Sequence, residues 1–128
     1  MKEYLSQFGI LTPKEIKDLE KKVTLKELKK GEFFIKEGQT SQEVGFVLSG
    51  ILRSFYHSSI EEEVTYCYTF SNTFVSAYSS FLSQNETQEN IEALTDVTLL
   101  SISKKEILAL EESSINWLKF FKLIAEQE

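Results

Sequence analysis

The sequence has one cysteine, one histidine and no nucleophile motif, and each scarcity excludes a class of chemistry. Cys67 alone cannot form an internal disulfide, and an iron–sulfur cluster needs several cysteines. Cys67 stands among aromatic residues, with no nearby Lys, Arg or His to favour a thiolate, so we expect a half-buried, unreactive side chain. His57, which we expect to be an exposed turn residue, is too little for a metal enzyme, whose site needs several His with a carboxylate. No Gly-x-Ser-x-Gly motif is present. We therefore expect no enzyme, metal or cofactor.

Long apolar runs are also missing, and basic residues are outnumbered. No run approaches the roughly 18 apolar residues that span a bilayer, and the polar start of the chain is not a signal peptide. We expect a cytoplasmic protein with no membrane partner. The net charge is −6 and the pI is about 4.9. Such a chain is not expected to bind nucleic acid itself, which requires clustered Lys and Arg.

The N-terminal part predicts helices. In the run 12–15, Thr12 can cap a helix, Pro13 suits its first position, and Glu15 can complete a capping box. Apolar residues then follow at spacings of three and four, so the helix should extend from about Pro13 to Lys22. Tyr4, Leu5 and Phe8 suggest another helical turn before it.

The middle of the chain predicts short strands with a turn about every ten residues. This pattern is typical of an all-β sandwich or barrel. Leu25 and Leu28 lead into a turn at 29–32. In 63–70 the residues alternate, with Val64, Tyr66, Tyr68 and Phe70 on one face. The predicted strands are 33–35, 44–48, 51–57, 63–70, 91–93 and 97–102.

The C-terminal part predicts two helices. Residues 103–106 form a second capping-box pattern, and a last helix should run over 115–127. Its apolar residues cover more than one stripe, which indicates two partners, the β body and a second copy of the chain. Deep packing within one molecule is the alternative. The chain ends directly after this helix, which suggests a piece of a longer protein. The expected dimer interface is Ile115, Leu118, Phe121, Lys122 and Ala125.

Three runs resemble the cyclic-nucleotide-binding domain of the Crp/Fnr family of bacterial transcription regulators. Residues 30–38 (K-G-E-F-F-I-K-E-G) are similar to the family's K-G-x-x-I-x-x-x-G, and residues 45–50 to its apolar strand ending in Gly. Residues 91–104 are similar to the strand pair and helix start after its phosphate-binding cassette. The resemblance implies a mainly β double-stranded β-helix (jelly roll) with flanking helices and a homodimer through the last helix. It also implies DNA binding only through a helix-turn-helix domain that would follow this chain.

On this basis 1–128 is expected to be a single domain. The N-terminal helices take up 1–22, the β-roll 23–102 with a cassette-like insertion at 74–90, and the C-terminal helices 103–128. In the family, the cassette offers a Gly-Glu to the ribose and an Arg followed by a small hydroxyl residue to the cyclic phosphate. Here Ser76-Ala77 and Thr87-Gln88 stand at those places. Arg53 could substitute only if its strand passed under the cassette; otherwise we expect a solvated arginine.

Charge in this region also disfavours a phosphate. Between Arg53 and Lys104 there is no Lys or Arg, whereas seven acidic residues occur there. A phosphate would lose a charge-assisted hydrogen bond worth roughly 1.5–3 kcal/mol, although helix-start amides could still bind an anion weakly. What remains suits a neutral or mostly apolar ligand, or a ligand-free core, and both stay open. The candidate ligand-binding residues are Phe74, Val75, Ser76, Ala77, Tyr78, Ser79, Ser80, Phe81, Thr87 and Gln88.

Two functions follow from the sequence. One is the effector-sensing and dimerisation domain of a Crp/Fnr-type regulator, with a degenerate cassette that does not bind cyclic AMP tightly. The other is a free-standing domain of the same kind that acts through protein interaction. A helix-turn-helix encoded beyond residue 128 would distinguish the first from the second.

Overall fold

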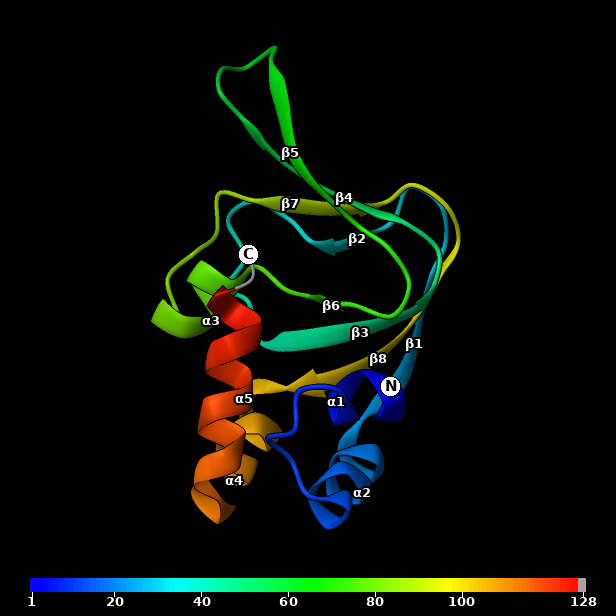
Figure 1. Cartoon of the computed structure of the whole chain (residues 1–128). Helices are drawn as coiled ribbons and strands as arrows, with labels where there is room; N and C mark the ends of the chain where they lie inside the picture. Colours follow the sequence, from blue (N-terminus) through cyan, green and yellow to red (C-terminus); the bar gives the residue numbers. More distant parts are fainter. Residues whose placement is uncertain (127–128) are drawn as a thin grey trace.

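The computed structural model describes residues 1–126, which form two antiparallel sheets with helices at one end (Figure 1). One sheet has the order β1-β8-β3-β6 and the other β2-β7-β4-β5. This is the jelly roll that the sequence predicts. The strands are β1 Thr24–Leu28, β2 Phe33–Ile35, β3 Glu43–Ser49, β4 Leu52–His57, β5 Glu63–Thr69, β6 Phe74–Val75, β7 Asn90–Ala93 and β8 Val97–Ser103.

Five helices complete the chain, and their starts follow the local sequence. The helix α2 begins with the full predicted capping box: the Glu15 amide donates to Thr12 Oγ1 (3.2 Å), and the Thr12 amide donates to Glu15 Oε1 (2.9 Å). At α4 only half of the predicted box forms. Ser103 accepts from the Glu106 amide, but the Glu106 carboxylate pairs with Lys22 instead. The helices are α1 Lys2–Ser6, α2 Pro13–Lys22, α3 Tyr78–Ser83, α4 Lys104–Ser113 and α5 Ile115–Glu126.

Two strands lie where no strand was predicted. The segment of β1 was interpreted only as a lead into a turn, yet all five of its residues pair with β8. The short strand β6 was counted as part of the cassette, but Phe74 and Val75 pair with β3. Both segments are strands because they pair with strands distant in the sequence. Neither has an alternation of apolar and polar residues clear enough to predict a strand. For the last helix, the predicted end at Gln127 lies outside the described residues.

The core has two parts. One lies inside the roll and includes Val47, Leu52, Ile91 and Leu99. The other packs the helices against the open end of the roll, around Trp117 and Phe120 of α5. Edge-to-face aromatic contacts at ring-centroid distances of 5.0–5.9 Å join these helices to the sheet. The rings involved are Tyr4, Phe8, Phe46, Phe74 and Phe120.

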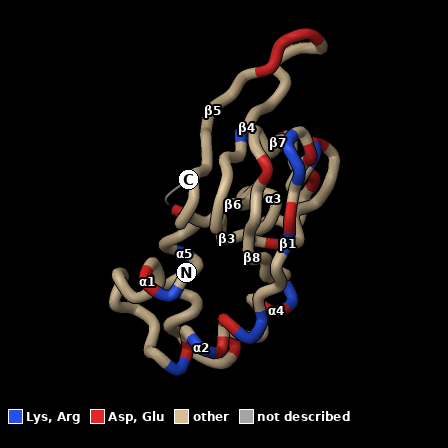
Figure 2. The backbone as a smooth tube through the Cα atoms, turned by 90° about the vertical axis from the view of Figure 1, so that its right-hand side faces the viewer, with Lys and Arg blue, Asp and Glu red and all other residues tan. Residues whose placement is uncertain are grey.

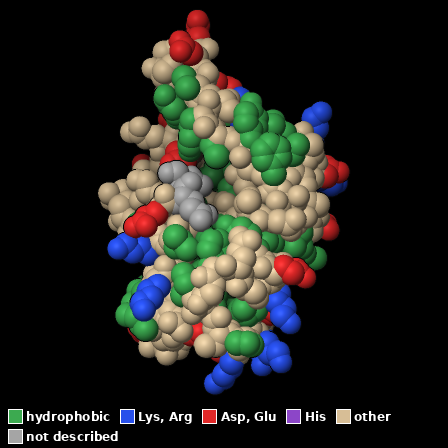
Figure 3. Space-filling view, viewed as in Figure 1, with side chains coloured by type: hydrophobic (Ala, Val, Ile, Leu, Met, Phe, Trp, Pro, Cys, Tyr) green, Lys and Arg blue, Asp and Glu red, His purple; other side chains and the backbone are tan. Residues whose placement is uncertain are grey.

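The β4–β5 hairpin projects from the body and carries little basic charge. Its tip is acidic (Figure 2), because Glu61, Glu62 and Glu63 follow one another at the turn. Hydrophobic side chains show on the surface along this hairpin (Figure 3). Tyr66 and Tyr68, on the face predicted to be aromatic, are about half exposed. The aromatic face of β5 is therefore only partly covered by the body, and only Thr69 of this strand is buried.

Candidate functional site

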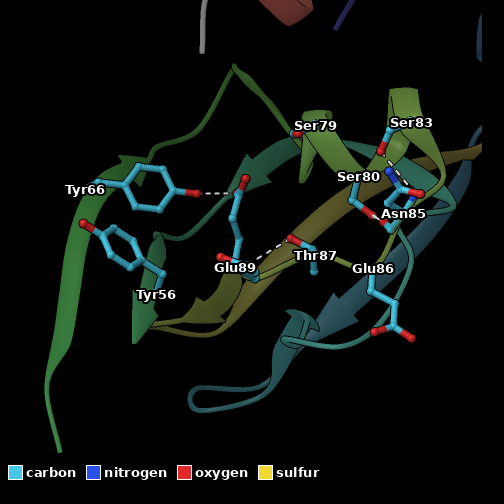
Figure 4. A pocket seen from close by; sticks show the side chains of 10 residues that line it. Tyr56, Tyr66, Ser79, Ser80, Ser83, Asn85, Glu86, Thr87 and Glu89 are labelled. Carbon is cyan, nitrogen blue, oxygen red and sulfur yellow. Dashed lines mark hydrogen bonds between the residues drawn. The ribbon is translucent and has the colours of Figure 1, made fainter. Parts of the chain in front are cut away.

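A polar cavity of about 640 Å³ lies between α3, the loop that follows it, and the β4–β5 hairpin. Figure 4 shows Tyr56 and Tyr66 on the hairpin side, with Ser79 and Ser83 of α3 across from them. The Tyr66 hydroxyl donates to Glu89 Oε2, and the Glu89 amide donates to Thr87 Oγ1 at 2.9 Å. This volume is typical of small-molecule sites. The lining residues are Tyr56, Tyr66, Ser79, Ser80, Ser83, Asn85, Glu86, Thr87, Gln88 and Glu89.

Four of the ten candidate ligand-binding residues line this cavity, and six do not. Ser79, Ser80, Thr87 and Gln88 are brought together there. The other six begin at Phe74, and five of them are buried while Phe74 is half-buried. They lie in β6, in the two residues before α3 and on the buried side of α3, so the structure places them away from this cavity. The six residues are Phe74, Val75, Ser76, Ala77, Tyr78 and Phe81.

The hydroxyls of Ser76 and Ser80 are engaged in internal hydrogen bonds. Ser76 Oγ donates to the Glu43 carbonyl (2.8 Å) and lies 3.2 Å from Ser41 Oγ. Ser80 Oγ accepts from the Ser41 amide (2.9 Å) and donates to the Asn85 carbonyl. These two serines therefore tie the start of β3 to α3, which is a structural task that the sequence pattern did not reveal.

Arg53 is paired, not solvated as predicted. Its guanidinium donates to Glu92 Oε1 at 2.9 Å and to Glu63 Oε2 at 3.2 Å, and it lies 4.0 Å from the centroid of the Phe55 ring. Burial would lower the pKa of Arg53, but the hydrogen bonds and charges of Glu92 and Glu63 outweigh it and raise the pKa above its ordinary value. Arg53 does not line the cavity, and its charge is already matched by two carboxylates.

The sequence profile of the cyclic nucleotide-binding domain matches residues 25–114, which is more than half of the chain. The chain belongs to the cyclic nucleotide-binding domain family. No curated protein matches the sequence closely enough to count as a relative. Membership agrees with the position of the cavity beside α3, where the cassette was predicted.

Solved structures of low sequence identity share the fold of this cyclic nucleotide-binding domain. The Thermus thermophilus catabolite activator protein is 21% identical, with a TM-score of 0.79 over 91% of this chain and 55% of its own. The sensor domain of the transcriptional regulator DNR from Pseudomonas aeruginosa is 16% identical (TM-score 0.79; 98% and 87% covered). A putative Crp/Fnr-family regulator from Eubacterium rectale is 18% identical (0.79; 98% and 58%). The chain thus spans about half the length of the first and third of these proteins.

No cation from the described part of this cyclic nucleotide-binding domain lines the cavity, whereas two carboxylates do. Glu89 turns toward Tyr66, and Glu86 points away from the tyrosines, at the rim (Figure 4). Tyr56, Tyr66 and Glu89 are cavity residues that were not predicted from the sequence. The alternation of 63–70 placed Tyr66 on the correct face, but only the folding of the hairpin over the cassette loop brings that face to Glu89.

The far end of α3 is anchored to the C-terminal helices. Gln84, in the left-handed region (φ 61°), caps α3 and donates from Nε2 to the carbonyls of Phe81 (2.7 Å) and Ser41 (3.1 Å). Lys104 Nζ, from the first residue of α4, also donates to the Phe81 carbonyl (2.7 Å) and lies 4.3 Å from the centroid of its ring. The cassette helix is thereby coupled to the segment that leads into α5.

The helix α5 has two apolar faces. Trp117, Phe120 and Ile124 are buried against the body. A second face borders an apolar groove of about 540 Å³ between α3, α4 and α5. Four of the five predicted interface residues line this groove: Leu118, Phe121, Lys122 and Ala125. Ile115, the fifth, does not line it and is exposed at the start of the helix.

Within residues 1–126, no helix combines the length and the apolar character that crossing a bilayer requires. No cluster of three or more His, Cys, Asp or Glu side chains that could hold a metal ion occurs in the same part of the chain. His57, at the end of β4, is exposed and lies 3.2 Å from a Glu37 oxygen. Cys67 is half-buried.

Proposed function

We propose that this chain is the effector-sensing and dimerisation domain of a Crp/Fnr-type transcription regulator, and that its cassette does not hold cyclic AMP tightly. The observation that carries the second part is the charge of the cavity. Glu86 and Glu89 line it, no described Lys or Arg does, and Arg53 is bound to Glu63 and Glu92. The domain would act by binding and transmission, not by catalysis, in the cytoplasm.

Affinity arithmetic supports a weak cyclic-nucleotide site. A hydrogen bond to a charged group contributes roughly 1.5–3 kcal/mol, so the missing arginine corresponds to about one to two decades in affinity. The carboxylates add repulsion, because a phosphate at the cavity would be desolvated beside like charges. Freeing Arg53 would leave the half-buried Glu92 and the exposed Glu63 without their partner, and the loss is costlier at Glu92.

The proposed mechanism is allosteric. An effector at the cavity would bias the position of α3, and the Lys104–Phe81 contact would transmit that change to α4 and α5. A homodimer through the exposed face of α5 would convert it into a change of spacing between two DNA-binding domains. The likeness to transcription regulators in fold supports this assignment over a free-standing interaction domain.

Isothermal titration calorimetry with cyclic AMP and cyclic GMP tests the cassette. We expect no submicromolar binding by the native chain, and a submicromolar isotherm would overturn the proposal. Gln88→Arg is the matched gain-of-charge variant, because Gln88 is exposed and lines the cavity. This arginine should tighten cyclic AMP binding by about tenfold, the lower end of the range for a charge-assisted bond.

A further inference from the structure

The cavity has one corner in which aromatic rings and a carboxylate meet. Tyr56 and Tyr66 pair across β4 and β5 with ring centroids 6.0 Å apart, and each remains about 40–45% exposed. The half-buried Glu89 stands beside them, with its carboxylate oriented by the Tyr66 hydroxyl (Figure 4). We call these three residues the Tyr–Glu corner.

Each part of the Tyr–Glu corner attracts positive charge. Aromatic faces carry a negative quadrupole, and a cation within about 6 Å of a ring centroid gains roughly 0.5–2 kcal/mol, depending on how far it is desolvated. The Glu89 carboxylate, held in place by Tyr66, attracts an ammonium charge by Coulomb interaction, and it can also accept hydrogen bonds from a protonated amine. Glu86 adds negative potential at the rim.

The other lining residues can orient a ligand, but they do not change the preference of the cavity for positive charge. They carry neutral hydroxyl and amide side chains and lie in α3 and the loop after it. The volume of about 640 Å³ accommodates a molecule much larger than a metal ion. A monovalent inorganic ion would leave most of it unfilled.

We propose that the cavity binds an organic cation, an amine or quaternary ammonium compound, with its charge at the Tyr–Glu corner. This inference rests on the proposed function, in which the cavity does not bind a cyclic nucleotide tightly. The effector would then carry the opposite charge to a cyclic nucleotide.

Calorimetry with choline and with its uncharged carbon analogue 3,3-dimethyl-1-butanol tests this inference on the full chain. The two probes have the same shape, so the difference between them isolates the charge. We expect choline to bind at least about tenfold more tightly, a difference that cation–π and carboxylate contacts together can supply. Raising the salt concentration should weaken choline binding and leave the alcohol unchanged. Equal affinities, or no choline binding at about 10 mM, would overturn the inference.

Two isosteric variants identify the corner. Glu89→Gln keeps the shape and removes the charge, and we expect about a tenfold loss of choline affinity because the coulombic attraction of the carboxylate for the quaternary nitrogen is lost. Glu112→Gln makes the same change on the exposed surface of α4, outside the cavity lining, and should bind as the native chain does. Equal losses in both variants would show that the overall charge of the protein, and not the corner, attracts the cation.

Cyclic AMP, titrated into the same preparation, separates this inference from the proposed function. A chain that binds neither choline nor cyclic AMP retains the proposed function and overturns only the cation inference. Submicromolar cyclic AMP binding overturns the proposed function, and the cation inference falls with it.

Discussion

Gly50, between β3 and β4, is required by two separate constraints. Its φ is +98°, and an added Cβ would lie 2.4 Å from the Asp96 carbonyl oxygen. Gly38 has a similar φ of +90° but open space around it. Gly38→Ala should therefore cost only the left-handed conformation, about 1 kcal/mol, whereas Gly50→Ala should cost at least about 1–3 kcal/mol more for the forced displacement. Urea unfolding of both variants measures the difference, and equal losses would show that the turn at Asp96, between β7 and β8, yields without cost.

Glu15 makes the start of α2 sensitive to acid. It accepts from the Thr12 amide and from Asn116 Nδ2 at 3.0 Å, which joins α2 to the first turn of α5. Burial alone would raise the pKa of Glu15, but the hydrogen bonds from Thr12, Ser114 and Asn116 outweigh it and lower the pKa. A lowered folded-state pKa means that the carboxylate stabilises the fold above the unfolded-state pKa of about 4.3 and loses this contribution as the pH falls through the folded-state value.

Glu15→Gln tests this titration, because glutamine preserves a capping box but carries no charge. The free energy of unfolding of the native chain should exceed that of the variant near pH 6, and the excess should disappear as the pH falls to about 3. Glu20→Gln, on the exposed side of the same helix, controls for the change in net charge. A native-to-variant difference that does not vary with pH would contradict the role assigned to Glu15.

At the scale of elements, the helices and strands that could be predicted from the sequence are those whose bounds depend on neighbouring residues. The bounds of α2 follow from its cap and its periodicity, and the strand pair after the cassette follows from alternation and a turn. The strands β1 and β6 were missed because their order comes from pairing with β8 and β3. The helix α3 and the loop after it lie within the predicted insertion 74–90, and four of the ten candidate residues line the cavity there. Sequence neighbours such as Ser76 and Ser79 look alike, and only their place relative to β3 decides that one is buried and the other faces the cavity.

The anchor between α3 and α4 yields a prediction at this scale. Lys104→Met removes the hydrogen bond to the Phe81 carbonyl but keeps an apolar chain over the Phe81 ring. The Gln84 amide, which bonds the Ser80 carbonyl at 2.7 Å, should then exchange its hydrogen about tenfold faster, because the end of α3 opens more easily. Lys105→Met, at the exposed neighbouring position, should leave this rate unchanged. Slow exchange in both variants would mean that Gln84 holds α3 without help from α4.

On the scale of the whole molecule, the two faces of α5 explain its composition. The buried face completes the core with Trp117 and Phe120, and the other face leaves Leu118 at 46% exposure on the rim of an apolar groove. Such a surface costs free energy in water, and a second copy of the helix would bury it. The proposed coupling from the cavity through Lys104 ends at this face. Dimerisation would therefore be the step through which a change at the cavity reaches the rest of a regulator.

Leu118→Lys tests the proposed dimer. In an antiparallel or parallel pair of α5 helices, the substitution would place a lysine charge from each chain in a buried seam, where desolvation opposes association. We expect the dimer dissociation constant to rise at least about tenfold, which corresponds to about 1.4 kcal/mol. Sedimentation equilibrium over a concentration series measures it for the native chain and the variant. Leu25→Lys, the same change at another exposed leucine on β1, should not alter it. A native chain that stays monomeric at the highest concentration, or an equal effect of both substitutions, would contradict association through α5.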